Sequence, residues 1–197
     1  SMISIPSVSR EEEKVADFLQ TYIEGIGIMT GRSGNNIWCI SPMFDMKKPT
    51  ILLNSHIDTV KPVNGWRKHP YTAKMENGKL YGLGSNDAGA SVVSLFEAYR
   101  YLSATEQAYN LIFLASCEEE VSGKNGIESV LPQLPPIALG VVGELTAVQN
   151  VCLSNLSIAC LNKHTLNAVL NILNSDGAIL YLTLKICGNL KCQKVDS

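Results

Sequence analysis

This 197-residue chain has few histidines and tryptophans, and neither sign of charge is in large excess. It has three histidines, two tryptophans, and 16 Lys and Arg residues against 18 Asp and Glu residues, a formal net charge of −2. This balance argues against a dedicated nucleic-acid surface or a polybasic membrane surface. No apolar run approaches the ~18 residues that a membrane span needs. The first residues lack the basic region and apolar stretch of a signal peptide, so we expect a cytoplasmic protein.

Cysteine pairs at zinc-knuckle spacing are also missing. None of the six cysteines, at positions 39, 117, 152, 160, 187 and 192, belongs to a Cys-x-x-Cys motif, which argues against a structural zinc knuckle. Without a secretory signal we expect free thiols. Because His56, His69 and His164 are the only histidines, a metal site or an acid–base site must consist mostly of carboxylates.

Hydrophobic residues make up 46% of the chain and charged residues 17%, so it can bury a core. Ser9, with Glu12 three residues later, predicts a capping box at the start of a helix. Asn77-Gly78 predicts a hairpin turn. Alternating helix and strand patterns predict an α/β fold with a mixed, largely covered sheet and helices on both faces. The expected strands span 36–41, 50–55, 110–116 and 137–143, and the later helices 92–102 and 127–131.

The charge pattern changes after residue 147. Residues 148–197 contain only six charged residues and one aromatic residue, and they are rich in Leu, Asn and Cys. We therefore expect a boundary near residue 147, with an atypical tail in residues 148–197. Apolar spacing within the tail indicates a helix around Thr165–Leu173 and a strand around Ala178–Ile186.

The first candidate site residues are His56 and Asp58, directly after an expected buried strand. On an extended segment, residues two apart face the same side, so Asp58 can reach the ring of His56. A carboxylate on one imidazole nitrogen fixes the tautomer and leaves the other nitrogen for a metal. The alternative is that both side chains are satisfied by the backbone at a strand end.

The second candidate is Asp87, which follows the glycine-rich turn 82–86 and precedes an expected helix. The alternative is an ordinary helix N-cap. A phosphate-binding loop is a weaker interpretation, because no third glycine follows at the dinucleotide spacing and no Gly-Lys-Ser/Thr is present.

Carboxylates also follow two further strands. Glu118, Glu119 and Glu120 come after strand 110–116, and Glu144 follows the last expected strand. Three consecutive carboxylates repel one another, which a nearby cation would relieve; the alternative for such a run is a solvated loop. Because sites in open α/β sheets gather at the carboxyl ends of strands, we expect these carboxylates to converge with the first two candidates.

The order of these motifs is similar to that of a known family. Ser-His-Ile-Asp-Thr-Val, Gly-Leu-Gly-Ser-Asn-Asp, Cys-Glu-Glu-Glu and Val-Gly-Glu together resemble the dizinc aminoacylase/carboxypeptidase superfamily. Within it, the chain looks like the branch of acetylornithine deacetylase and succinyl-diaminopimelate desuccinylase. The resemblance covers roughly residues 1–147 and implies that they are the N-terminal part of a metallohydrolase catalytic domain, whereas residues 148–197 do not match the family.

This resemblance implies a zinc-dependent amidohydrolase. It implies that Asp58 orients His56, and that Glu119 is the general base that takes a proton from the attacking water and passes it to the leaving amine. One or two Zn²⁺ ions are the expected cofactor, and Co²⁺ or Mn²⁺ would suit the same ligands. The implied metal ligands are His56, Asp87, Glu120 and Glu144.

The chain also departs from the family pattern. Leu145 stands where Pro usually follows the Glu, and Glu118 replaces an Asp. The family takes a second-metal His from near the end of a chain almost twice as long, and an inserted lid domain carries a substrate-binding His. Neither motif is found here, and nothing around His164 fits one. We therefore expect one complete metal site, a weak second site, and activity far below that of a complete enzyme.

The leading functional expectation is hydrolysis of a small N-acyl amino acid, with acetylornithine-like substrates first and succinylated diaminopimelate second. Glu144 favours the deacylase branch, because several peptidase branches place Asp there. The alternative is a non-catalytic remnant that binds a metal or a partner chain. Missing partner strands would expose sheet edges, which either the tail covers or self-association buries.

Overall fold

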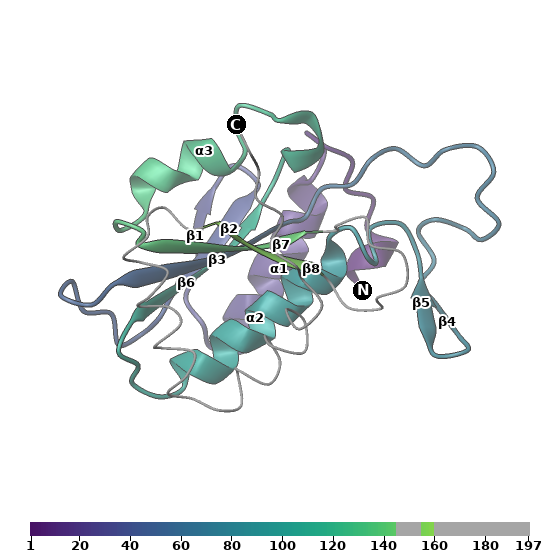
Figure 1. The fold of residues 1–197 in the computed structure, drawn as a ribbon. Coiled ribbons are helices and arrows are strands. Elements are labelled where there is room, and N and C mark those ends of the chain that lie inside the picture. Colours follow the sequence, from purple (N-terminus) through teal and green to yellow (C-terminus); the bar gives the residue numbers. More distant parts are fainter. Residues whose placement is uncertain (145–154, 160–197) are drawn as a thin grey trace, which may run out of the picture.

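A computed structural model describes residues 1–144 and 155–159 of the chain. Its centre is a six-stranded mixed sheet with strand order β1-β2-β6-β3-β7-β8 (Figure 1). β6, β3 and β7 run parallel, and β1, β2 and β8 each pair antiparallel. The predicted mixed α/β fold is confirmed. The strands are β1 (Gly31–Ser33), β2 (Asn36–Ile40), β3 (Thr50–His56), β6 (Asn110–Ser116), β7 (Leu139–Glu144) and β8 (Asn155–Ala159).

Helices cover both faces of this sheet. α1 (Glu13–Gly25) and α2 (Gly89–Ser103) lie on one face, and α3 (Ile127–Val130) lies on the other (Figure 1). The hairpin of β4 (Lys74–Glu76) and β5 (Lys79–Tyr81) stands apart from the main sheet. Three short 3-10 turns complete the described elements: η1 (Met2–Ser4), η2 (Glu119–Val121) and η3 (Leu131–Gln133).

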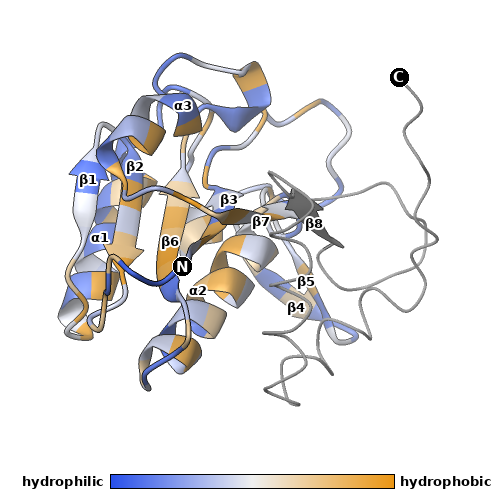
Figure 2. Ribbon diagram, turned by 60° about the vertical axis from the view of Figure 1, so that its left-hand side comes forward, coloured by the Kyte–Doolittle hydropathy of each residue, from blue (hydrophilic) through white to orange (hydrophobic). Residues whose placement is uncertain are grey.

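Strand β6 shows how the sequence builds two cores at once. Leu111, Phe113 and Ala115 pack with α1 and α2, whereas Ile112 and Leu114 pack toward α3. Successive side chains of a strand point to opposite faces, so a strand covered on both sides is apolar without interruption. Figure 2 shows β6 as a hydrophobic strand among the helices. This burial fixes the strand ends that carry the polar residues described below.

The expected elements within residues 1–144 all form, with ends that differ by up to three residues. The Asn77-Gly78 turn is confirmed, because both residues have the positive φ, 52° and 72°, that a two-residue hairpin turn favours. Strands β1 and β8 were not predicted. β8 belongs to the 148–197 segment and pairs along β7, so part of that segment lines one sheet edge. The helix and strand expected at 165–173 and 178–186 lie outside the described residues.

The predicted capping box at Ser9 and Glu12 is wrong. α1 begins at Glu13, and its N-cap residue, Glu12, makes no side-chain capping bond. The Ser9 hydroxyl instead donates to the Asp58 carboxylate at 2.7 Å, and the Glu12 carboxylate accepts the backbone N–H of Glu118 at 3.1 Å. Both side chains bond to residues far along the chain and do not cap the helix that follows them.

Cys39 and Cys117 are buried free thiols. Burial, with a smaller contribution from nearby carboxylates, raises the pKa of each to about 12. Within the described residues, no helix is both long enough and apolar enough to cross a membrane.

Candidate metal centre

The candidate site lies at the carboxyl edge of the three parallel strands. β3 ends at His56, whose register partner on β6 is Ser116, two residues before the acidic turn formed by Glu118, Glu119 and Glu120. β7 pairs with the other side of β3 and ends at Glu144. Because parallel strands end at the same edge of a sheet, the topology brings these segments together as the sequence predicts.

Buried polar side chains of β3 tie the strand ends to one another. The Ser55 hydroxyl donates to the Gly143 carbonyl at 2.9 Å, and the Asn54 amide donates to the Ser116 hydroxyl at 3.0 Å. All of these groups lie in the interior, where a hydrogen bond is worth more than in water. The edge of the sheet is therefore fixed directly beneath the site.

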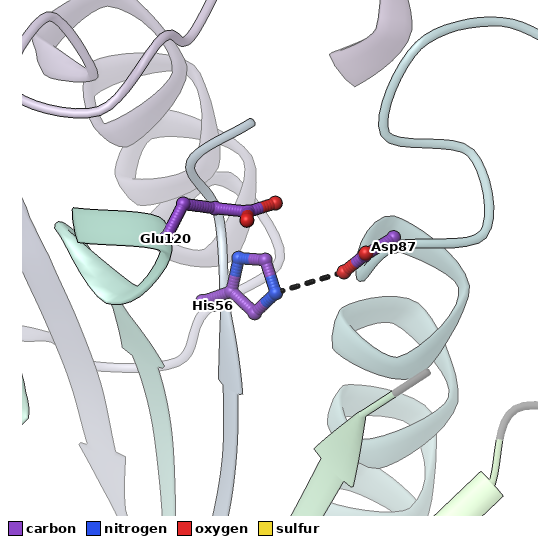
Figure 3. Close-up of side chains that lie close together, drawn as sticks. All are labelled: His56, Asp87 and Glu120. Atoms are coloured by element: carbon purple, nitrogen blue, oxygen red, sulfur yellow. Dashed lines mark hydrogen bonds and ion pairs between the residues drawn. The ribbon is translucent and has the colours of Figure 1, made fainter. Parts of the chain in front are cut away.

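His56 is at the centre of the site. Its side chain is only 1% exposed, and its Nε2 lies 3.1 Å from Asp87 Oδ1, 3.6 Å from Glu144 Oε1 and 3.8 Å from Glu119 Oε2. Figure 3 shows the imidazole pointing to Asp87, with the Glu120 carboxylate beside it. These carboxylates are partly exposed, so the site opens to solvent above a buried imidazole.

Two overlapping sets of three side chains could each hold a metal ion. The ligand atoms of His56, Asp87 and Glu120 lie within 4.8 Å of one another, as do those of His56, Glu119 and Glu144. One imidazole nitrogen with several carboxylate oxygens suits Zn²⁺, and also Co²⁺ or Mn²⁺. All the metal ligands expected from the sequence, with the expected base Glu119, thus lie together. We expected the complete site to combine His56, Asp87 and Glu144. In the two sets, Glu144 instead accompanies Glu119, whereas Glu120 accompanies Asp87, as expected for the second site.

Asp87 reaches this cluster from the segment before α2. The N-cap residue of α2 is Ala88, and no side chain caps this helix. Asp87 is thus not the ordinary N-cap that sequence alone leaves open: its carboxylate faces His56. The peptide bond between Asp87 and Ala88 is cis.

Asp58 holds the other nitrogen of the imidazole. This carboxylate is fully buried, and its Oδ1 lies 3.3 Å from His56 Nδ1, which also lies 3.0 Å from the Asp58 carbonyl oxygen. With Nδ1 occupied on this side, Nε2 is the nitrogen that faces the acidic cluster. The predicted pairing of Asp58 with His56 is what the geometry shows.

Charges within the cluster oppose burial at His56 and Asp58. Burial alone would lower the pKa of His56, but the hydrogen bond and charge of Asp58, with the charges of Glu144 and Glu119, raise it to about 9. Burial alone would raise the pKa of Asp58, but hydrogen bonds from His56, Ser9 and the backbone of Glu119 and Glu120 lower it. The pair therefore favours an imidazolium beside a carboxylate until a cation replaces the proton.

The opposite holds for the two glutamates at the mouth of the site. Burial, together with the neighbouring carboxylates, raises the pKa of Glu119 and of Glu120, and His56 only partly compensates. Like charges held this close are stabilised by a divalent cation between them. The chemistry of the cluster therefore fits a metal ion.

Glu118, the first residue of the acidic run, points away from the cluster. It is buried, and its carboxylate accepts the backbone and side-chain N–H groups of Asn125 at 3.3 and 2.8 Å. His69 lies on the exposed loop before β4, where its ring nitrogen is 3.3 Å from the Tyr71 backbone nitrogen. His164 lies outside the described residues.

Sequence reasoning missed three residues that support the site. Ser9 donates to Asp58, Glu12 accepts from Glu118, and Asn36 Oδ1 accepts the backbone N–H of Cys117 at 3.1 Å. The one available signal was the spacing of Ser9 and Glu12. That spacing is the same whether the two side chains cap their own helix or bond to distant residues. Asn36, at the start of a strand, gave no signal at all.

A cavity of about 340 Å³ adjoins the cluster. Its lining includes Trp66, Tyr81, Asp87 and Glu120. This volume lies within the range of small-molecule sites, and aromatic side chains beside polar ones are typical of such sites. A small substrate would therefore have room next to the carboxylates.

Comparison with known proteins identifies the family of this chain. Residues 52–185 match Peptidase family M20/M25/M40, a range that runs past residue 147; the domain division at that position stays a prediction. A succinyl-diaminopimelate desuccinylase of Variovorax paradoxus is 30% identical over 165 residues, 75% of this chain and 42% of that protein. That of Wigglesworthia glossinidia brevipalpis is 34% identical over 110 residues, 52% of this chain and 29% of that protein. The chain thus spans less than half the length of these relatives.

Solved structures share the fold. An M20 family metallo-carboxypeptidase of Sulfolobus solfataricus superposes with a TM-score of 0.58 at 20% identity, over 72% of this chain and 35% of that one. Human carnosine dipeptidase 1 gives a TM-score of 0.56 at 18% identity, over 73% and 37%. With the family match covering more than half of the chain, this protein belongs to peptidase family M20/M25/M40.

Proposed function

We propose that this chain carries the metal-binding part of a hydrolase that splits the amide bond of a small N-acyl amino acid. The observation that supports it best is the convergence of one imidazole and four carboxylates at a single sheet edge. The proposed ligands are His56, Asp87, Glu120 and Glu144. A zinc ion, when bound, supplies a Lewis acid that activates water and polarises the amide carbonyl.

Glu119 is the proposed general base. Its side chain is 51% exposed, and its Oε2 lies 3.8 Å from His56 Nε2, so it reaches both the cluster and solvent. Burial and the neighbouring carboxylates raise its pKa, which suits a group that must first accept and then release a proton. As the water oxygen bonds to the acyl carbon, Glu119 accepts the water proton. It then gives that proton to the amine nitrogen as the C–N bond breaks.

The relatives suggest the order in which acyl groups should be tested. Both relatives described above are named succinyl-diaminopimelate desuccinylases, so N-succinyl amino acids come first. N-acetyl amino acids of the acetylornithine kind, the leading expectation from sequence, come second.

The test is hydrolysis of N-succinyl-diaminopimelate by the full 197-residue chain with added Zn²⁺, compared with its Glu119→Gln variant. Loss of a general base lowers the rate about 10²–10⁴-fold. Glu128→Gln makes the same chemical change on α3 at an exposed residue and should leave the rate unchanged. Turnover that survives Glu119→Gln would overturn the assignment of this base.

A second candidate is metal binding without turnover. It is favoured by the composition of the cluster, which among the described residues contains a single histidine, His56, and otherwise only carboxylates. Zn²⁺ binding that His56→Ala abolishes, with no hydrolysis of succinyl or acetyl substrates, would support this candidate over the first.

A further inference from the structure

A buried carboxylate outside the cluster contacts the turn that carries Glu119 and Glu120. Glu12 is completely buried. Its Oε1 accepts the backbone N–H of Arg10 at 2.7 Å and that of Glu118 at 3.1 Å, and its Oε2 accepts the Asn35 amide at 3.0 Å. No Lys or Arg of the described residues forms an ion pair with it. Because a buried charge without a cation is costly, these three donors are what stabilise it.

The bond to Glu118 is one of a series. Four successive backbone N–H groups after β6 each donate to a side chain that comes from a distant part of the chain. These bonds run from Cys117 to Asn36, from Glu118 to Glu12, and from Glu119 and Glu120 to the two carboxylate oxygens of Asp58, all at 3.1 Å. The direction of the turn is therefore set by acceptors outside it.

Glu118 is the residue at which the chain changes direction. Its φ of 55° and ψ of 24° place it in the left-handed region, which is uncommon for a residue other than glycine. Such a conformation persists only where the surroundings over-determine it. Here Glu12 holds the N–H of Glu118, and Asn125 holds its carboxylate. The next two residues then project toward His56.

We propose that Glu12 is a positioning residue for the metal centre: its carboxylate, by accepting the Glu118 N–H, aims the Glu119 and Glu120 side chains at His56. The proposal rests on the proposed function for the roles of those two glutamates. The hydrogen bonds of the Glu12 carboxylate go to Arg10, Asn35 and Glu118, none of which is a proposed ligand, so Glu12 acts through the backbone.

The first experiment titrates Co²⁺ into the full chain and records the visible absorption of the bound ion. Replacing outer groups that orient metal ligands typically lowers affinity about 10–100-fold. We expect that loss, with a changed spectrum, for Glu12→Ala and for Glu12→Asp, whose shorter side chain cannot reach Arg10 and Glu118 together.

Glu12→Gln should restore the parent affinity and spectrum. Its amide oxygen can accept both backbone N–H groups, while the Asn35 amide turns to present its oxygen. Ile23→Ala is the matched control, because this fully buried residue loses packing on the same helix at the end away from the site. Parent-like Co²⁺ binding by folded Glu12→Ala would overturn the proposal, as would an equal loss in Ile23→Ala. If Glu12→Ala does not fold, the comparison of Glu12→Asp with Glu12→Gln decides in the same way.

A second readout does not depend on metal. Amide hydrogen exchange of Glu118, Glu119 and Glu120, measured by NMR with chelator present, should accelerate in Glu12→Asp and Glu12→Ala relative to Ile23→Ala. Unchanged exchange in those three amides overturns the proposal. If the parent chain binds no Co²⁺, the proposed function fails, whereas accelerated exchange still supports the positioning role of Glu12.

Discussion

Asp58→Asn removes the charge from the side chain that receives the most hydrogen bonds in the site. Asp58 Oδ1 accepts the Glu119 N–H and faces His56, and Oδ2 accepts the Glu120 N–H and the Ser9 hydroxyl. An asparagine has the same shape but only one acceptor oxygen. Its NH₂ group must therefore face a donor, and one of the two backbone N–H groups loses its acceptor.

The magnitude follows from these contacts. A buried donor left without a partner costs about 1–3 kcal/mol, so the free energy of unfolding in chelator should fall by that amount. The same change frees the imidazole and the acidic turn, and the affinity for Zn²⁺ should fall about 10–100-fold, equivalent to about 1.4–2.8 kcal/mol.

Urea unfolding and competitive Zn²⁺ titration measure the two quantities separately. Ser9→Ala is the control, because it removes one hydroxyl donor and leaves the charge and both backbone bonds of Asp58 in place. It should cost about 1 kcal/mol of stability and little affinity. Asp58→Asn with the stability and Zn²⁺ affinity of the parent would refute the reasoning.

Three further predictions follow from the described residues. The pKa of His56 is raised from 6.5 to about 9, so in chelator its contribution to stability, up to about 3 kcal/mol, is full below pH 6.5. That contribution should be lost as the pH rises through 9, so the urea midpoint of the parent should fall over this range. The urea midpoint of His56→Ala should not show this fall. Burial raises the pKa of Cys39 and Cys117 to about 12, so peptide mapping should find neither alkylated by iodoacetamide at pH 7.5 until urea unfolds the chain; labelling of the native protein would contradict this. A Cβ at Gly143 would lie 2.6 Å from a side-chain carbon of α2, whereas one at Gly140 on the same strand would meet no atom of the described residues within 4 Å. Gly143→Ala should therefore cost about 1–3 kcal/mol in thermal unfolding and Gly140→Ala far less, and equal losses would contradict the packing of β7 on α2.

The positions of the charged groups were predictable because they depend on strand ends. His56 and Glu144 each end a buried parallel strand, and a parallel sheet brings such ends to one edge whatever the details of the loops. The hairpin turn was predictable for a similar reason, since Asn77 and Gly78 are residues that tolerate positive φ.

What could not be predicted depends on contacts between distant parts of the chain. Ser9 and Glu12 have the spacing of a capping box, but their partners lie 49 and 106 residues away. The direction of Glu118 depends on Glu12, which accepts its backbone N–H, and on Asn125, which donates to its carboxylate. Local sequence does not indicate which of the three adjacent glutamates points away from the metal cluster.

Metal stoichiometry of the purified chain tests the central claim most directly. The 197-residue protein would be loaded with Zn²⁺, dialysed against metal-free buffer and analysed by inductively coupled plasma mass spectrometry, with His56→Ala in parallel. The account predicts about one retained zinc ion per chain and none in the variant. No retained metal in the parent, or equal metal in both proteins, would contradict it.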